Sequence, residues 1–485
     1  MKSTFLVTIG ALALTNQSVL ADKKSENSPN VIIILADDQG YGGVNCYPHN
    51  KRVITPNIDK LAESGVKFTQ AYTSGHVCSP TRAGLMTGKY QQSFGFYGLS
   101  EPHVGGIPKT EKILPQYLKE YGYTTGLVGK WHLGDYERNY PINMGFDYFY
   151  GFIEGQHDYF NPVVGHSWEG GSNGLAFMME DKEPVAAMKY STFEFTDKAV
   201  EYIKKNAYKP FFLYLAYNAI HAPLEAPDDL LKKYADNPDK PNRDDVVRAM
   251  TVALDDGVGQ VVETLKKLKL SENTIIFYLS DNGGATFSDN WDLRGSKGSY
   301  YEGGIRVPFI VSWPGQLPAG KTISNPVISI DIAPTILGIL SEKQNVMNGV
   351  NLLPYLKGEK TEAPHDILFW GVGKKGETPE KNEFAVRQGK WKLVSDPRLV
   401  KDCNLYDIEA DPSEKYGLRQ KYPEKFDELY KIYMNWINQM PASLVNDDNR
   451  RLNGNDLIKD YEQKGGKKRS VVPGGYEVKS KSKGW

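Results

Sequence analysis

Short, continuous apolar runs, two of which end in acidic residues, constrain the fold of this chain more than any other feature of its sequence. Four runs have this character: Val31–Leu35, residues 125–128, residues 211–215 and Thr274–Leu279. The first is followed by Asp37 and Asp38, and the last by Asp281 and Asn282. Such runs are typical of strands buried on both faces of a sheet. Because helical patterns separate them, they predict an α/β fold with a large, mostly parallel sheet sandwiched by helices.

Helix signals fill the gaps between these runs. Thr55 precedes Pro56, a pair typical of an N-cap and a first helical residue, and residues 245–270 carry a long helical pattern. In sheets of this kind, ligands bind beyond the carboxyl ends of the strands. The polar residues that follow each apolar run are therefore the candidates for a functional site.

The pattern changes after about residue 364, where strand-like pieces become shorter and a helical stretch follows at 423–440. We expect an α/β domain over residues 22–364 and a smaller α+β subdomain over residues 365–450 packed on it. Residues 451–485 are basic, with Gly-Gly pairs and Lys-Ser alternation, and we expect them to form a flexible tail.

The first 21 residues have the pattern of a secretory signal peptide. Lys2 precedes an apolar run from Phe5 to Leu14, and Ala21 is a small residue suited to cleavage before Asp22. A buried N-terminal helix is the alternative, which the charged residues that follow disfavour. No later segment reaches the roughly 18 apolar residues of a membrane span. We therefore expect an exported protein, periplasmic or secreted, with no membrane span.

Charge and cysteine content narrow the class of protein. Lys plus Arg number 58 and Asp plus Glu number 59, so no net positive field recruits nucleic acid. The three cysteines, Cys46, Cys78 and Cys403, are too few for a disulfide scaffold. Cys46 and Cys403 could pair in an oxidising compartment, but nothing in the sequence shows that they meet. At least one thiol is left over.

The segment around Cys78 combines a thiol, a helix start and an arginine. Ser79 is a candidate N-cap and Pro80 a candidate first helical residue, which would put Cys78 at a helix N-terminus. Backbone N–H groups favour an anion there, and Arg82 adds a cation one turn along. This arrangement predicts an oxyanion site with a nucleophile beside it. An inert, buried cysteine next to a structural arginine is the alternative.

Oxygen donors and cations both lie at the expected ligand end of the sheet. The carboxylate and amide side chains after the first and last runs suit Ca²⁺ or Mg²⁺, although a single acidic pair after a strand is more often a turn or a cap. Four lysine or histidine residues belong to this end as well: Lys130, His132, His221 and Lys297. Singly, each is weak evidence, because such residues are usually solvated or structural. Together they could bind an anionic ester, as enzymes do for phosphoryl groups.

The segment from Cys78 to Gly88 has Cys-x-Pro-x-Arg followed by Met-Thr-Gly, which is similar to the signature of the formylglycine-dependent sulfatases of the alkaline-phosphatase-like superfamily. The resemblance extends from about residue 30 to about residue 414, with Thr81 in place of the serine common in the motif. It implies that a maturation enzyme oxidises Cys78 to formylglycine, whose hydrate is the nucleophile. It also implies one bound Ca²⁺ with these ligands: Asp37, Asp38, Asp281, Asn282 and an oxygen of the modified Cys78.

The same resemblance implies roles for the cations. Arg82 and Lys130 would hold the nucleophile and the sulfate oxygens. His221, with Lys297 nearby, would donate a proton to the leaving group. His132 would help to deprotonate the second hydroxyl of the hydrate, so that sulfate leaves and the aldehyde is restored.

The substrate implied by the resemblance is a sulfated carbohydrate. Secreted bacterial relatives often desulfate polysaccharides, and the sequence is similar to sulfatases that act on marine galactans such as carrageenan. Aromatic, histidine and arginine side chains commonly contact sugars or anionic groups. The candidate sugar contacts are His157, His166, Trp168, Trp291 and Arg294.

Two alternatives to an active sulfatase remain open at this point. A phosphatase or phosphodiesterase of the same superfamily generally has serine or threonine as its nucleophile, which the complete Cys78 motif disfavours. An inactive sugar-binding homologue is disfavoured because all catalytic positions are present. The match extends to Glu302 and Arg306, which we expect to form a structural ion pair under the site.

Overall fold

The computed structural model describes seven stretches of the chain: residues 28–98, 106–134, 137–165, 175–340, 346–372, 383–398 and 403–442. The expected signal peptide at 1–21 and the expected tail at 451–485 lie outside the described residues. No helix within the described stretches is long and apolar enough to cross a membrane.

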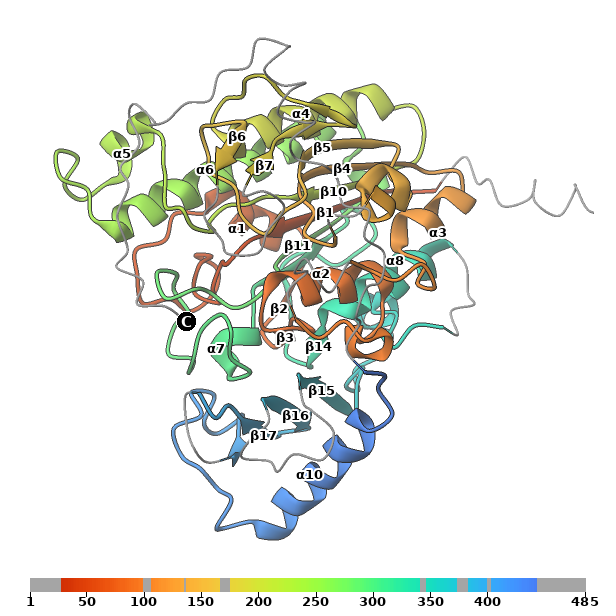
Figure 1. Cartoon of the computed structure of the whole chain (residues 1–485), viewed down its shortest axis with the longest axis vertical. Helices are drawn as coiled ribbons and strands as arrows, with labels where there is room; N and C mark the ends of the chain where they lie inside the picture. Colours follow the sequence, from red (N-terminus) through yellow and green to blue (C-terminus); the bar gives the residue numbers. More distant parts are fainter. Residues whose placement is uncertain are drawn as a thin grey trace, which may run out of the picture.

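A ten-stranded sheet forms the centre of the main body (Figure 1), with the strand order β13-β2-β12-β11-β1-β10-β4-β5-β8-β9. Its strands are β1 (Asn30–Ala36), β2 (Val66–Phe68), β4 (Thr124–Lys130), β5 (Tyr148–Phe152), β8 (Met179–Glu180), β9 (Glu183–Pro184), β10 (Phe211–Ala216), β11 (Thr274–Ser280), β12 (Phe309–Ser312) and β13 (Lys321–Ile323). The five neighbours β11, β1, β10, β4 and β5 run parallel, and antiparallel pairs flank them on both sides. The predicted mostly parallel sheet is confirmed.

Two small sheets and a set of helices complete the main body. The small sheets pair β3 (Ala71–Tyr72) with β14 (Val327–Ile328), and β6 (Val163–Gly165) with β7 (Leu175–Phe177). The α-helices are α1 (Pro56–Glu63), α2 (Cys78–Thr87), α3 (Leu114–Glu120), α4 (Ser191–Asn206), α5 (Asp228–Tyr234), α6 (Arg243–Lys267), α7 (Glu302–Ile305), α8 (Ile332–Leu340) and α9 (Leu353–Lys357). Short 3₁₀ helices are η2 (Gln91–Phe94), η3 (Glu137–Asn139), η4 (Pro141–Met144), η5 (Ser271–Asn273) and η6 (Ser329–Asp331).

Alternate residues of the central strand β1 enter two different cores. Ile33 and Leu35 belong to one cluster, which includes apolar side chains of α2, α3 and α8. Ile32 and Ile34 belong to the other, which includes apolar side chains of α1, α4 and α6. Because successive strand residues point to opposite faces, a continuous apolar run fits a sheet that helices cover on both sides.

The long helix α6 begins at Arg243, two residues before the expected start. Asn242 is the cause, because its side chain accepts a hydrogen bond from the Asp245 backbone N–H at 3.0 Å. The Asp245 carboxylate in turn accepts one from the Asn242 N–H at 2.9 Å. This reciprocal capping box satisfies two backbone donors at the helix N-terminus.

A separate four-stranded antiparallel sheet and one helix lie at the C-terminal end of the described chain, in blue at the bottom of Figure 1. These elements are β15 (Ile367–Gly371), β16 (Phe384–Gln388), β17 (Trp391–Ser395), β18 (Asn404–Asp407) and α10 (Pro423–Ile437). One apolar cluster joins this sheet to the main body through Trp370 and Tyr301, and another, around Phe384 and Tyr433, lies between the sheet and α10. The expected small α+β unit is present, and we call its sheet the C-terminal sheet.

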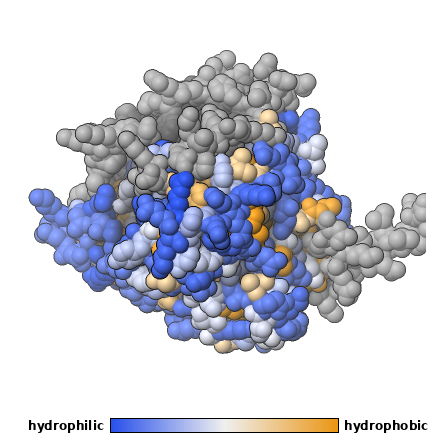
Figure 2. Space-filling model, turned by 90° about the horizontal axis from the view of Figure 1, so that it is seen from below, coloured by the Kyte–Doolittle hydropathy of each residue, from blue (hydrophilic) through white to orange (hydrophobic). Residues whose placement is uncertain are grey.

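The surface seen from below, in Figure 2, is mainly hydrophilic, with hydrophobic residues scattered singly or in small groups. Scattered apolar residues are normal on a soluble surface and mark no docking site by themselves. The functional site is therefore sought at the strand ends.

Candidate active site at the carboxyl ends of the central strands

The parallel strands β1, β10, β11 and β4 bring their carboxyl ends to one edge of the sheet. Asp37 and Asp38 follow β1 directly, and Asp281 and Asn282 follow β11, its neighbour. All four side chains are buried. Lys130 is the last residue of β4, so a cation enters the same region from two strands away. The strand-end residues expected to come together do so.

Helix α2 presents Cys78 to this region, but it begins two residues earlier than expected. Its first residue is Cys78 itself, and Val77, in an extended conformation, takes the N-cap position. The predicted Ser79 cap is wrong, because the Ser79 hydroxyl instead donates a hydrogen bond to the His132 carbonyl at 2.7 Å. That contact ties the start of α2 to the segment after β4.

Arg82 joins the helix to two strand ends. Its Nη2 and Nε atoms lie 2.7 and 3.0 Å from the Asp281 carboxylate, and its Nη1 donates to the Lys130 carbonyl at 2.9 Å. The side chain is fully buried, so the guanidinium has exchanged water for these acceptors. A paired, hydrogen-bonded charge of this kind can be held in a buried site.

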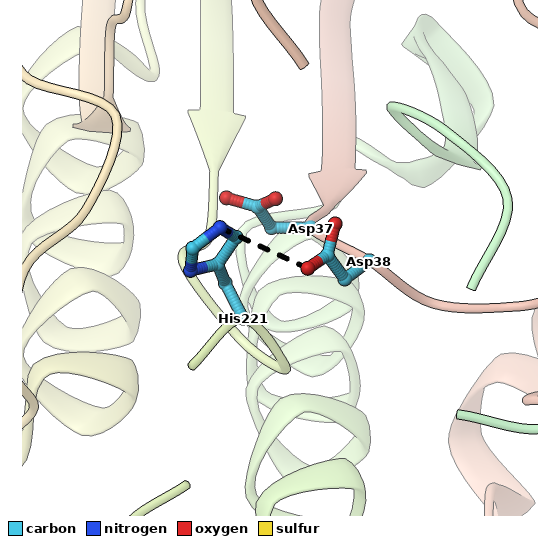
Figure 3. Close-up of side chains that lie close together, drawn as sticks. All are labelled: Asp37, Asp38 and His221. Carbon is cyan, nitrogen blue, oxygen red and sulfur yellow. Dashed lines mark ion pairs between the residues drawn. The ribbon is translucent and has the colours of Figure 1, made fainter. Parts of the chain in front are cut away.

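Two lysines neutralise the aspartates after β1. Lys130 Nζ lies 2.6 Å from Asp37 Oδ2, and Lys297 Nζ lies 2.8 Å from Asp38 Oδ1. His221 Nε2 lies 3.8 Å from Asp38 Oδ2, and Figure 3 shows this imidazole facing the two carboxylates from the loop that follows β10. We call the six charged groups here the strand-end cluster: Asp37, Asp38, Asp281, Arg82, Lys130 and Lys297.

Burial and the neighbouring positive charges shift the pKa values of the aspartates in this cluster in opposite directions. Burial would raise the pKa of Asp37, but the charge of Lys130, together with that of Arg82, outweighs it and holds that pKa below its usual range. Asp281 differs: burial, together with the negative charge of Asp37, raises its pKa despite the nearby Arg82. A further positive charge, in addition to Arg82, Lys130 and Lys297, would stabilise all three carboxylates in the ionised form.

Burial and the neighbouring cations lower the pKa of both histidines of the site. Burial lowers the pKa of His132 well below its usual value, and the charges of Lys130 and Arg82 add to the effect. Burial and the charge of Lys297 also lower the pKa of His221. Both imidazoles are therefore neutral at neutral pH while no anion is bound, so each can accept a proton.

Several oxygens of the site have the geometry of metal ligands. Candidate ligand atoms of Asp37, Cys78 and Asp281 lie within 4.8 Å of one another. Asp37 Oδ1 and Asn282 Oδ1 are buried and have no hydrogen-bond partner among the described residues. The Asn282 amide nitrogen donates to Asp38 Oδ1 at 2.8 Å, which turns its own oxygen away from that carboxylate. Buried oxygens without donors are costly, and a hard divalent cation fits them.

The predicted sugar contacts differ from one another in burial and in the residues around them. His157 is only 1% exposed, with Nδ1 2.8 Å from the Asp158 carbonyl, so it offers almost no surface to a sugar. Trp291 is half-buried near Tyr41, and the Arg294 guanidinium is engaged with residues of the C-terminal sheet. His166 and Trp168 lie outside the described residues.

Tyr159 is a residue of the site that sequence reasoning missed. Its hydroxyl lies 2.7 Å from the Asn218 carbonyl and 2.8 Å from the His221 carbonyl, and it is fully buried. It therefore helps to fix the loop that carries His221. The sequence holds no signal for this role, since a tyrosine in an aromatic-rich segment is typical of any core.

The remaining predictions concern Glu302, Arg306 and the spare cysteines. Arg306 Nη1 lies 3.4 Å from Glu302 Oε2, and both side chains are largely buried, so the expected ion pair is present. Cys46 and Cys403 form no disulfide with each other. Burial raises the pKa of the Cys46 thiol to about 12, which makes it a poor nucleophile.

Cys78, a buried residue at a helix tip, lies among carboxylates, lysines and histidines at the strand ends. This arrangement is that of a hydrolase of anionic esters. Comparison with known proteins then narrows the class. The family profile described as "Sulfatase" matches residues 29–342, and a profile described as "N-sulphoglucosamine sulphohydrolase, C-terminal" matches residues 295–439. The chain belongs to the sulfatase family, and it is a sulfuric ester hydrolase.

Relatives and solved structures agree with this assignment. The N-acetylgalactosamine-6-sulfatase of Sus scrofa is 32% identical over 469 residues, which cover 86% of each chain. Among solved structures, Ps i-CgsB in complex with k-i-k-neocarrahexaose is 33% identical with a TM-score of 0.77, covering 89% of this chain and 97% of that one. The PsFucS1 sulfatase from Pseudoalteromonas sp. is 25% identical with a TM-score of 0.67, covering 89% and 95%.

Proposed function

We propose that this sulfatase removes sulfate from a sulfated polysaccharide or oligosaccharide, with formylglycine made from Cys78 as the nucleophile and one bound Ca²⁺. One observation carries the proposal. Buried oxygens of Asp37 and Asn282 have no hydrogen-bond partner among the described residues, and ligand atoms of Asp37, Asp281 and Cys78, the first residue of α2, lie within 4.8 Å of one another. Oxygens left in this state favour a hard cation beside the nucleophile.

Four side chains would hold the ion: Asp37, Asp38, Asp281 and Asn282. Bound there, Ca²⁺ would supply a positive charge that polarises a sulfate oxygen and favours the ionised form of the nucleophile. Oxygen donors of this kind suit Ca²⁺ or Mg²⁺ better than a soft metal, and the resemblance to formylglycine-dependent sulfatases favours Ca²⁺.

Burial at position 78 supports a modified side chain over a free thiol. Cys78 is 3% exposed, and burial raises the pKa of its thiol, so the unmodified residue would be a poor nucleophile at neutral pH. The hydrate of formylglycine supplies an oxygen nucleophile instead. Because Cys78 is buried, the maturation enzyme would reach it before the chain folds.

The chain's own cations would bind and orient the sulfate. Lys130 bonds the Asp37 carboxylate and Arg82 the Asp281 carboxylate, and their charges would also counter that of the sulfate oxygens. His132 is neutral and buried, so it can take a proton from the group at position 78. These are the roles that the resemblance to the family assigns them.

The leaving sugar oxygen requires a proton, and we propose that His221, with Lys297 nearby, supplies it. The pKa of His221 is lowered while the site is free, chiefly through burial and the charge of Lys297. An incoming sulfate brings negative charge, which raises the pKa of His221 and favours its protonation. As the ester S–O bond breaks, the proton would pass from this pair to the sugar oxygen.

The substrate class follows from the relatives. One is named for N-acetylgalactosamine 6-sulfate chemistry, and Ps i-CgsB was crystallised with k-i-k-neocarrahexaose. We infer a sulfated glycan, with a marine galactan such as carrageenan as the first choice. Polysaccharide substrates also agree with the expected export to the periplasm or the medium.

The test is desulfation of a panel of defined sulfated oligosaccharides, including carrageenan fragments, by protein expressed with and without a maturation enzyme. We expect only the matured protein to release sulfate from these substrates. We also expect that activity to be lost when a chelator removes Ca²⁺. Peptide mass spectrometry would report the state of residue 78 in the same samples. Turnover by protein whose Cys78 is unmodified would contradict the proposal.

A further inference from the structure

Lys297 is held by a loop rather than by a strand or helix. We call residues 283–301, between β11 and α7, the Lys297 loop. Its Gly295 and Gly298 have φ values of 79° and 87°, a region that glycine adopts more readily than other residues. A loop of this composition needs outside contacts to hold one conformation.

The nucleophile segment supplies one such contact. The Gly298 N–H donates to the His76 carbonyl at 2.8 Å, two residues before Cys78. Within the loop, the Lys297 N–H donates to the Gly284 carbonyl at 3.0 Å. The backbone on either side of the Lys297 side chain is thus fixed to the site.

The C-terminal sheet and the segment after it hold the other side of the Lys297 loop. Arg294 Nη1 donates to the Tyr406 hydroxyl, in β18, at 3.1 Å and to the carbonyl of Glu414, beyond β18, at 2.8 Å. Its guanidinium lies over the Tyr301 ring at 4.3 Å. Arg398, just beyond β17, donates to the Gly298 carbonyl, next to Lys297.

A buried ion cluster secures the end of the loop. Glu414 Oε2 accepts a hydrogen bond from the Glu302 N–H at 2.6 Å. Lys392 Nζ, from β17, lies 2.7 Å from Glu302 Oε1 and 3.0 Å from Glu414 Oε1. We call these three fully buried residues the Glu302 cluster. Such a cluster fixes geometry, because displacing any member would leave a buried charge without its partner.

We propose that the C-terminal sheet and the segment that follows it are part of the catalytic apparatus. Arg294, in the Lys297 loop, and Glu414, in the segment after β18, are positioning residues that hold Lys297 beside the oxygen of the leaving sugar. This inference rests on the proposed function. As a hydrate oxygen at position 78 forms its bond to sulfur, the bond between sulfur and the sugar oxygen breaks. Its electron pair stays on the sugar oxygen, which takes its proton from His221 with Lys297 alongside. A displacement of about 1 Å in such a group can reduce the rate on the order of 100-fold.

The test compares two leaving groups in the matured protein. Arg294→Met keeps an apolar stem over Tyr301 but removes the donors to Glu414 and Tyr406. A sugar alkoxide needs a proton in the transition state, whereas nitrophenolate leaves without one. We expect kcat for the sugar sulfate to fall about ten-fold or more while kcat for 4-nitrophenyl sulfate changes by less than about two-fold.

Arg419→Met is the matched control. Arg419 belongs to the same C-terminal α+β unit, with Nη1 3.3 Å from the Cys403 carbonyl, just before β18, and its guanidinium 4.1 Å from the Phe426 ring on α10. These contacts join parts of the C-terminal unit to each other, so we expect both rates to stay at the wild-type value. Equal losses on both substrates in Arg294→Met, or a rise in KM alone, would overturn the proposal, since the second result indicates a sugar contact.

A second measurement is independent of activity. The Lys297 and Gly298 amides should exchange with deuterium about ten-fold faster in Arg294→Met and at the wild-type rate in Arg419→Met. Unchanged exchange in Arg294→Met would contradict positioning by the C-terminal sheet. If the wild-type protein hydrolyses no sulfate ester, the proposed function fails, while the exchange result still decides whether the sheet holds the loop.

Discussion

The strand-end cluster and the Glu302 cluster are both buried sets of acids and bases, but they differ in what surrounds their unsatisfied oxygens. In the Glu302 cluster one carboxylate oxygen, Glu414 Oε1, makes no hydrogen bond, and the charge of Lys392 lies 3.0 Å from it. In the strand-end cluster Asp37 Oδ1 has no hydrogen-bond donor among the described residues, and the neighbouring Asn282 Oδ1 has none either. Burial of charge therefore does not identify a site by itself. Two unsatisfied oxygens close to the helix that presents Cys78 favour a bound ligand, because a ligand would satisfy them.

The largest effect should follow from changing the nucleophile. We expect Cys78→Ser to reduce kcat/KM for the best sugar sulfate by about 1,000-fold or more, because a serine hydroxyl lacks the second oxygen that releases sulfate. The melting temperature should stay within a few degrees, since the volume hardly changes. Cys46→Ser, at a half-buried thiol away from the site, is the control and should retain full activity. Wild-type turnover by Cys78→Ser would refute the mechanism.

The next largest effect should be a loss of stability when the Glu302 cluster loses its lysine. Lys392→Met leaves two buried glutamates without their shared cation, and we expect the free energy of unfolding in urea to fall by about 3 to 5 kcal/mol. Lys390→Met is the matched control, since Lys390 forms an ion pair with Asp407 from the surface, with its own side chain 46% exposed, and such a pair should contribute at most about 1 kcal/mol. If the two variants unfold at the same urea concentration, the Glu302 cluster is not structural.

Addition of Ca²⁺ should stabilise the folded protein through the strand-end cluster and not through the Glu302 cluster. Binding to the folded state alone stabilises it by about 2.7 kcal/mol at an ion concentration 100 times the dissociation constant. We expect this gain in the wild-type protein and in Lys392→Met, and its loss in Asp38→Asn. Asp38 has a φ of 62°, which asparagine tolerates, so the backbone should be preserved. A Ca²⁺-dependent gain that survives Asp38→Asn would place the ion elsewhere.

The smallest effect is a pH dependence within the Glu302 cluster. Burial and the charge of Glu302 raise the pKa of Glu414 to about 7, above its usual 4.5. The folded protein then binds more protons than the unfolded chain between these values, so stability falls as pH rises from 4.5 to about 7. We expect Glu414→Gln to flatten this slope by on the order of 1 kcal/mol across the range, measured by urea unfolding at several pH values. A slope identical to that of the wild type would contradict the assignment.

The strand ends could be predicted from sequence because continuous apolar runs leave little choice of fold. Val31–Leu35 and Thr274–Leu279 are buried on both faces, and parallel neighbours place the residues that follow them at one edge. The family resemblance added the roles of Cys78 and the cations. Geometry then showed which oxygens remain open, a fact that no residue pattern contains.

Other features depend on contacts that are distant in sequence. Ser79 had the residue type of an N-cap, but its hydroxyl bonds the His132 carbonyl, so tertiary contact decided the start of α2. His157 had the residue type of a sugar contact, but packing buries it. The contact of Glu414 with Glu302 links residues 112 positions apart, and no local signal predicts such a pairing.

The most direct test of the central claim is a crystal structure of the matured protein grown with Ca²⁺. We predict a single strong peak coordinated by oxygens of Asp37, Asp38, Asp281 and Asn282, with an oxygen of a formylglycine hydrate at position 78 completing the shell. A thiol at position 78 in active crystals, or a cation bound away from these four residues, would contradict the account.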